Sequence, residues 1–117
     1  MKIPVQSDWI NTQVFTDANG DLINFESAFD SLKVIFLTAT FDKIVEYEFE
    51  VDDEFSKISN GIAQVVWNHA DNVDNYIGNV LIQYCFTVIN TTWTQYSEPK
   101  LFIEVTTEKP NPVEVTP

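Results

Sequence analysis

Residues 44–51 alternate apolar and acidic side chains with a period of two. The apolar members are Val45, Tyr47, Phe49 and Val51, and the acidic members between them are Glu46, Glu48 and Glu50. Successive side chains of a strand point to opposite faces, whereas a helix repeats every 3.6 residues. The segment is therefore predicted to be a half-buried strand with the three glutamates along one face.

The remainder of the chain has the composition and spacing of further strands. Val and Ile together number 24, against 11 for Leu, Ala and Met, and branched side chains suit a pleated sheet. The pairs Asn19-Gly20 and Asn60-Gly61 are typical of tight turns. The other expected strands are 9–15, a short one at 21–25, 32–40, 62–67, 79–89, 93–96 and 101–105. Residues 68–75 read as a polar loop with room for one helical turn.

This pattern predicts an all-β protein, an antiparallel β-sandwich of seven or eight short strands. The 117 residues correspond to one domain, and 44% hydrophobic content excludes a disordered spacer. We expect an N-terminal arm over residues 1–8, the sandwich over 9–106 and an extended tail over 107–117. The tail contains three prolines in its last eight residues, which cannot sit inside a sheet.

The charge balance excludes several classes of partner. Eighteen acidic residues against six lysines and no arginine leave a net charge of −12. Nucleic acids and anionic membranes are recognised by cationic side chains, so we expect neither. Cys85 is the single cysteine and is expected to be a packed strand residue, so no intrachain disulfide can form. No secretory signal or membrane-spanning run is evident, which indicates synthesis in a reducing cytoplasm.

Catalytic and metal-binding patterns are weak. His69 is the only imidazole, in a polar loop, and no Gly-x-Ser-x-Gly turn or Gly-rich phosphate loop occurs. Seven acidic residues lie between residues 42 and 54, but their spacing matches no calcium loop. We therefore expect no enzyme activity, no cofactor and no metal, while a hard-cation site in the acidic segment stays open as the less favoured alternative.

Binding to other proteins is the expected use of the remaining features. The acidic face of Glu46, Glu48 and Glu50 would steer a basic partner surface. Exposed aromatic residues are common at interfaces, whereas Trp67, at the end of a strand, is expected in the core. The candidate partner-binding residues outside the acidic face are Trp9, Trp93, Tyr96, Pro110 and Pro112.

The order of these features resembles a known family over about residues 9–105. Residues 13–22 (QVFTDANGDL) resemble the strand, Asp-x-x-Gly turn and short strand that open the small immunoglobulin-like (Ig-like) modules of tailed-bacteriophage virion proteins. Residues 60–65 (NGIAQV) are similar to a later strand of the group. A glycine then precedes a long strand at 79–88, and Ser97-Glu98-Pro99 leads into a final strand. The closest likeness is to the N-terminal module of upper-baseplate proteins.

The resemblance implies an Ig-like sandwich and a non-enzymatic structural role in a virion, made in the host bacterial cytoplasm. Baseplate proteins of that kind carry further domains, whereas we expect a single module followed by a Pro-rich tail here. We therefore expect a capsid auxiliary or decoration protein on the capsid exterior. It would dock on other virion proteins, either the major capsid protein or tail and baseplate subunits. A tail or baseplate adaptor is the alternative within this class. A carbohydrate- or receptor-binding module that uses Trp9, Trp93 and Tyr96 for stacking is the alternative from another class.

Overall fold

The computed structural model describes residues 1–107, and most of these residues lie in strands. The strands are β1 (Lys2–Pro4), β2 (Trp9–Val14), β3 (Phe29–Leu37), β4 (Lys43–Glu48), β5 (Phe55–Ser59), β6 (Ile62–Trp67), β7 (Gly78–Val88), β8 (Thr94–Tyr96) and β9 (Lys100–Thr106). The helical elements are α1 (Phe25–Ala28) and the 3₁₀ turn η1 (His69–Asp71). The prediction of an all-β protein is confirmed.

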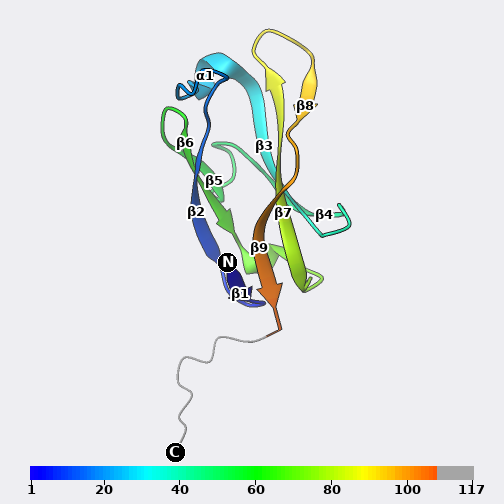
Figure 1. The fold of residues 1–117 in the computed structure, drawn as a ribbon. Helices are drawn as coiled ribbons and strands as arrows, with labels where there is room; N and C mark the ends of the chain where they lie inside the picture. Colours follow the sequence, from blue (N-terminus) through cyan, green and yellow to red (C-terminus); the bar gives the residue numbers. More distant parts are fainter. Residues whose placement is uncertain (108–117) are drawn as a thin grey trace, which may run out of the picture.

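The strands form two sheets. The large sheet has the order β1-β9-β7-β3-β4, with β8 paired to the far part of β7, and the small sheet has the order β2-β6-β5. Neighbours are antiparallel, except that β1 runs parallel to β9. Residues 2–4 of the expected N-terminal arm therefore belong to the large sheet. In Figure 1, α1 and the β7–β8 hairpin lie at one end of the molecule, and β1 lies at the other.

One hydrophobic core joins the two sheets. Inward residues of both sheets alternate with outward ones, as β6 shows with Ala63, Val65 and Trp67 fully buried. The Trp67 ring packs edge-on against Phe36 of β3, with ring centroids 5.4 Å apart. On β7, Val80 and Ile82 are buried, and Tyr84 and Phe86 pack against the same core. Trp67 lies in the core, as predicted.

The strand predicted at residues 44–51 is shorter than expected. β4 ends at Glu48, and Glu50 lies in a turn with φ of +62°. The carboxylate of Asp52 accepts the N–H of Glu48 at 2.7 Å, which closes this turn. Glu50 therefore does not continue the glutamate face of the strand, and Val51 is 67% exposed instead of buried. The expectation of three aligned glutamates is wrong because a side-chain hydrogen bond redirects the backbone.

The segment predicted as a strand at residues 21–25 is also different. Only Leu22 forms a β-bridge, with Thr16, and α1 begins at Phe25. The Asn24 side chain accepts the N–H of Glu26 at 3.2 Å, which is the usual way to cap a helix start. The two Asn-Gly turns are confirmed. Gly61 has φ of +76°, and a Cβ there would lie 2.8 Å from the Cβ of Leu22.

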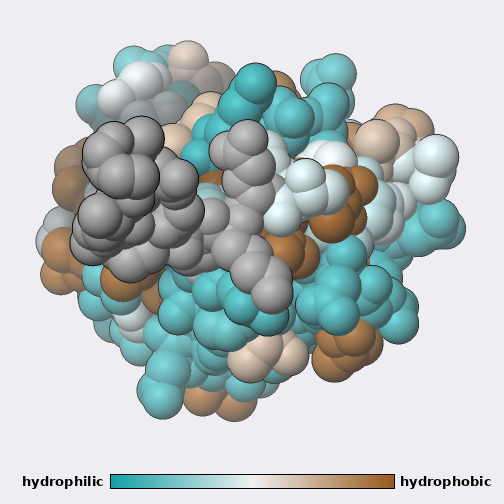
Figure 2. Space-filling model, turned by 90° about the horizontal axis from the view of Figure 1, so that it is seen from below, coloured by the Kyte–Doolittle hydropathy of each residue, from teal (hydrophilic) through white to brown (hydrophobic). Residues whose placement is uncertain are grey.

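The predicted tail residues Pro110 and Pro112 lie outside the described residues. Figure 2 views the end of the molecule that carries β1, where hydrophobic side chains form separate patches between hydrophilic ones. Within residues 1–107, no helix has the length and apolar content needed to cross a membrane.

Candidate interaction site

The β7–β8 hairpin carries two of the predicted aromatic contact residues. Trp93 is 71% exposed and Tyr96 is 63% exposed, although large aromatic side chains are usually buried. Both belong to the end of the molecule opposite β1, where the hairpin extends beyond the sheet core (Figure 1). We call residues 89–93 together with Asp30 the hairpin tip.

The tip is built by local hydrogen bonds. Asn90 adopts the left-handed conformation with φ of +59°, which Asn tolerates better than most residues. The Thr91 hydroxyl donates to the carbonyl of Val88 at 2.8 Å and accepts the N–H of Trp93 at 3.3 Å. The indole is therefore carried by a short turn with several hydrogen bonds.

The start of β3 holds the tip in place. The Asp30 carboxylate accepts the N–H of Asn90 at 3.1 Å, and the N–H of Ile89 donates to the carbonyl of Ala28 at 3.0 Å. Between these elements lies an open hollow of about 450 Å³, lined by Asp30, Asn90, Thr91, Thr92 and Trp93. Hydroxyl, amide and carboxylate groups beside an exposed indole suit hydrogen bonding and stacking on a partner surface.

Tyr96 belongs to a different surface from Trp93. The register places Glu48, Lys33, Cys85 and Tyr96 in one row across β4, β3, β7 and β8, on the outer face of the large sheet. A hydrogen bond with the Cys85 side chain raises the pKa of the Tyr96 hydroxyl. Cys85 lies on a strand as expected, but it is half-buried on this outer face instead of in the core.

Two of the acidic residues predicted as a docking face, Glu46 and Glu50, form bonds within the fold. The Glu46 carboxylate lies 2.6 Å from Lys43 Nζ and 3.7 Å from Lys33 Nζ. The hydrogen bond from Lys43 lowers the pKa of Glu46. Glu50 accepts the N–H of Lys57 at 3.2 Å, across the turn that follows β4. Glu48 lies on the strand between them, so only Glu46 and Glu48 share a strand face.

Trp9 does not join the other predicted aromatic residues. It lies at the start of β2, directly opposite Trp67 of β6, and is half-buried against the core. Trp93 lies next to Asp30, at the start of β3 and the opposite end of the sandwich. The structure therefore brings Trp93 and Tyr96 onto one hairpin but leaves Trp9 apart from both.

Two polar pairs were not foreseen from the sequence. His69 Nδ1 lies 2.6 Å from Asp8 Oδ1, and the same oxygen accepts the N–H of His69 at 2.9 Å. These bonds lower the pKa of Asp8, with the backbone N–H contributing most. The Tyr47 hydroxyl donates to Asp71 at 2.6 Å, and burial together with this carboxylate raises the pKa of Tyr47. No local pattern signals pairs that lie 61 and 24 residues apart.

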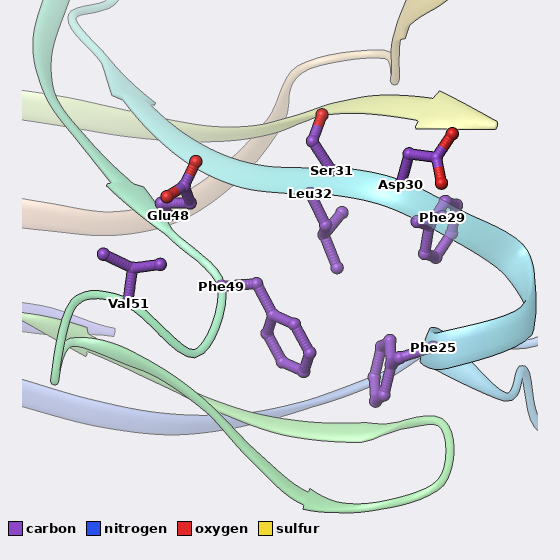
Figure 3. Close-up of a pocket in the computed structure, with 8 residues that line it drawn as sticks. All are labelled: Phe25, Phe29, Asp30, Ser31, Leu32, Glu48, Phe49 and Val51. Carbon is purple, nitrogen blue, oxygen red and sulfur yellow. The ribbon is translucent and has the colours of Figure 1, made fainter. Parts of the chain in front are cut away.

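The hollow shown in Figure 3 has an apolar interior. It measures about 250 Å³, and the side chains of Phe25, Leu32 and Phe49 extend into it. The carboxylates of Asp30 and Glu48 lie far apart, at opposite ends of the hollow (Figure 3). His69 lines neither this hollow nor the tip hollow. Acid–base chemistry needs converging groups, and these two hollows do not provide them.

Metal ligands and known relatives add no further assignment. In the described part of the chain, no group of three or more His, Cys, Asp or Glu side chains is placed to hold a metal ion. No family model matches the chain, and no curated protein or solved structure is significantly similar to it.

Proposed function

We propose that this chain is an Ig-like module that acts without catalysis, as a docking component of a bacteriophage particle. The observation that carries the proposal is the strand order. In variable-type Ig domains one sheet contains strands B, E and D, and the other contains G, F, C and C′. The orders β2-β6-β5 and β9-β7-β3-β4 correspond to these sets. In this correspondence β1 is an additional strand beside G.

The docking role is supported by the hairpin tip. In this correspondence the tip is the F–G loop, at an end of the sandwich where Ig-like domains commonly place binding loops. Trp93 offers a large rigid contact area, and the anchored turn beneath it lowers the entropy cost of binding. Tyr96 offers a second exposed aromatic contact on the same hairpin, but on the outer face of the large sheet and apart from the tip. Neighbouring virion subunits are the partners that the sequence resemblance favours, and we place the module on the capsid exterior.

A carbohydrate- or receptor-binding module is the competing proposal. The exposed indole of Trp93, beside Thr91, Thr92 and Asp30, supports it, because sugars are bound by stacking together with hydrogen bonds. Trp9 contributes nothing to this site because it lies at the other end of the sandwich.

Immunogold labelling of purified particles tests the proposal. Antibodies against the chain are expected to decorate heads of intact particles, whereas decoration of tails would favour the adaptor alternative. The Trp93→Ala variant, supplied during particle assembly, is expected to incorporate poorly, and Ile58→Ala on strand β5 of the small sheet serves as the matched exposed control. Absence of the chain from purified particles would overturn the virion role. Binding of the isolated chain to a glycan array would then favour the competing proposal.

Truncation after Thr106 tests the tail separately. All nine strands lie within residues 2–106, so the shortened chain is expected to keep its cooperative unfolding transition. We expect it to fail to enter particles, because the tail residues Pro110 and Pro112 are proposed to anchor it. Circular dichroism and quantification in purified particles measure the two effects. Full incorporation of the truncated chain would remove the tail from the docking role.

A further inference from the structure

Strand β2 forms one edge of the small sheet and lacks the features that normally protect an edge. Its sequence, Trp-Ile-Asn-Thr-Gln-Val, contains no charged residue and no proline, and its pairing with β6 is unbroken over six residues. Within residues 1–107 it pairs with β6 alone. A long, regular, uncharged edge is a template for pairing with another strand.

The other edges of the described sheets are protected. β4 carries Lys43, Glu46 and Glu48, and its register with β3 shifts near its start. β5 contains Lys57 and a register shift beside it. β1 and β8 are only three residues long, and β1 ends at a proline. Charge, bulges, proline and short length are the usual devices against edge pairing, and β2 has none of them.

The backbone groups of β2 that face away from β6 can be assigned. The N–H of Phe15 donates to the carbonyl of Gly61 at 2.7 Å, so this residue points toward β6. Because backbone direction alternates along an antiparallel strand, the N–H and C=O groups of Ile10, Thr12 and Val14 point to the open side. Next to this side lies a hollow of about 460 Å³ between residues 13–16 and the segment 97–100.

The strand is complementary to itself. In an antiparallel pair of two β2 strands centred on Thr12, Ile10 lies opposite Val14 of the second copy, and Thr12 lies opposite its own equivalent. These are the residues whose backbone groups face outward, so the register would form about six hydrogen bonds. On the inward face Asn11 lies opposite Gln13, so amide meets amide. Apolar and Thr–Thr pairs stabilise antiparallel strands.

The same register extends the outer face of the small sheet. Ile10 lies beside Val66, and Val14 lies beside Ile62, in the pairing of β2 with β6. Side chains of Ile10 and Val14 are 60% and 61% exposed. Two-fold pairing would therefore give two rows of four branched apolar side chains, one on each side of a Thr12–Gln64 row. Pairing buries these exposed side chains in part against each other.

Local charge does not oppose a second copy at this edge. Asp8 and Asp17 flank β2, and in this register they lie opposite Thr16 and Ser7 of the second copy, so no acid faces an acid. The remaining repulsion is the long-range one between two chains of net charge −12. Salt screens such repulsion beyond roughly 8–10 Å.

We propose that two copies of this protein associate through antiparallel pairing of their β2 strands, centred on Thr12, to form one six-stranded sheet. A strand from another protein, or the residues after Thr107 folded back on the same chain, are the other occupants of this edge, and either would leave the purified protein monomeric.

Sedimentation equilibrium of the full chain tests the proposal. We expect a reversible monomer–dimer equilibrium in which the dissociation constant decreases by roughly tenfold between low salt and about 0.5 M NaCl. Thr12→Lys and Thr12→Glu each place like charges opposite one another and should weaken the dimer by roughly tenfold or more. Gln64→Lys is the matched control, because this residue lies on the same face but on the central strand β6, and it should change the constant little.

Mixing the two variants identifies the register. An equimolar mixture of Thr12→Lys and Thr12→Glu should dimerise about as well as the unmodified protein, because opposite charges then face each other at the two-fold axis. Both substitutions are at an exposed position, and circular dichroism of each variant checks that it is folded. A monomer at all concentrations in high salt overturns the proposal. So does a dimer that neither substitution weakens, or one that the mixture does not restore.

Discussion

The two sheets share one core but differ in their outer faces. The outer face of the large sheet carries charges of both signs, because Glu46 forms ion pairs with Lys33 and Lys43. The outward residues of β2 and β6 in the small sheet are Ile10, Thr12, Val14, Ile62, Gln64 and Val66, without any charge. A chain with net charge −12 thus keeps two adjoining strands free of charge on one face. Overall charge therefore says little about where a protein can be contacted by another.

The strongest test of this comparison concerns the two faces of β6. Trp67→Ala removes a fully buried indole that packs on Phe36, and we expect the free energy of unfolding to fall by about 3–5 kcal/mol. Val66→Ala, next along the strand on the outward face, should cost less than about 1 kcal/mol. Urea denaturation measures both. Equal losses would contradict the assignment of the inward and outward faces.

A second test compares two tyrosines of the large sheet that flank Val34 on either side. Tyr47 donates a hydrogen bond to Asp71, whereas the buried hydroxyl of Tyr84 has no partner within residues 1–107. Tyr47→Phe should lower the free energy of unfolding by about 1–3 kcal/mol, because a charged acceptor loses its donor. Tyr84→Phe should leave the free energy of unfolding unchanged or raise it, because the buried Tyr84 hydroxyl loses water without gaining a hydrogen bond. Thermal and urea unfolding measure the stability of both variants. Equal changes in the two variants would refute the Tyr47–Asp71 bond as a stabilising contact.

Alkaline pH gives a related effect of smaller size. Burial raises the pKa of both tyrosines in the folded protein above the value of about 10 expected in the unfolded chain, and Asp71 adds to the effect at Tyr47. A raised pKa means that the unfolded chain loses its proton first. The contribution of the two protonated tyrosines to the free energy of unfolding should thus be fully present below about pH 10, and it should decrease as the pH rises further. Tyr84→Phe should make this decrease less steep, and an unchanged slope would contradict the raised pKa of Tyr84.

The smallest effect is expected for the charges on the outer face of the large sheet. The lysines that lower the pKa of Glu46 favour its charged form, so their contribution is present above about pH 4.5 and is lost as the pH falls below it. Because the pair is partly exposed, Glu46→Gln should cost less than about 1 kcal/mol near neutral pH. Asp8, just before β2 of the small sheet, is a similar case: Asp8→Asn removes the carboxylate partner of His69 and should also lower the free energy of unfolding slightly. A larger loss would indicate that these pairs are less screened by solvent than their exposure implies.

Much of the strand pattern was predictable because the signal is local. The strand at 62–67 has the predicted bounds, β2 differs from prediction by one residue at one end, and β7 and β9 differ by one residue at each end. Their alternation of side chains is a property of each segment by itself. β5 was missed because Phe55–Ser59 is short and mixes Ser and Lys with two apolar residues. β1 was missed because three residues ending in proline carry almost no periodic signal.

The candidate site was predictable only in part. Trp93 and Tyr96 were selected for their type, but their exposure depends on a hairpin that extends past the core and on the anchor at Asp30. Trp9 was selected on the same ground, yet its position opposite Trp67 places it against the core. The alternation of Glu46, Glu48 and Glu50 was real, but the bond between Asp52 and the N–H of Glu48 ends the strand before Glu50.

The amino-acid sequence by itself determined where most of the longer strands lie and where the Asn-Gly turns fall, because each depends on neighbouring residues. The tertiary structure alone decided the order of the strands and which edges stay unpaired. It also decided which distant polar groups meet, as Asp8 and His69 do. Backbone hydrogen bonds between strands are alike for every sequence, so pairing is selected by the packing of the whole core and cannot be read from one segment.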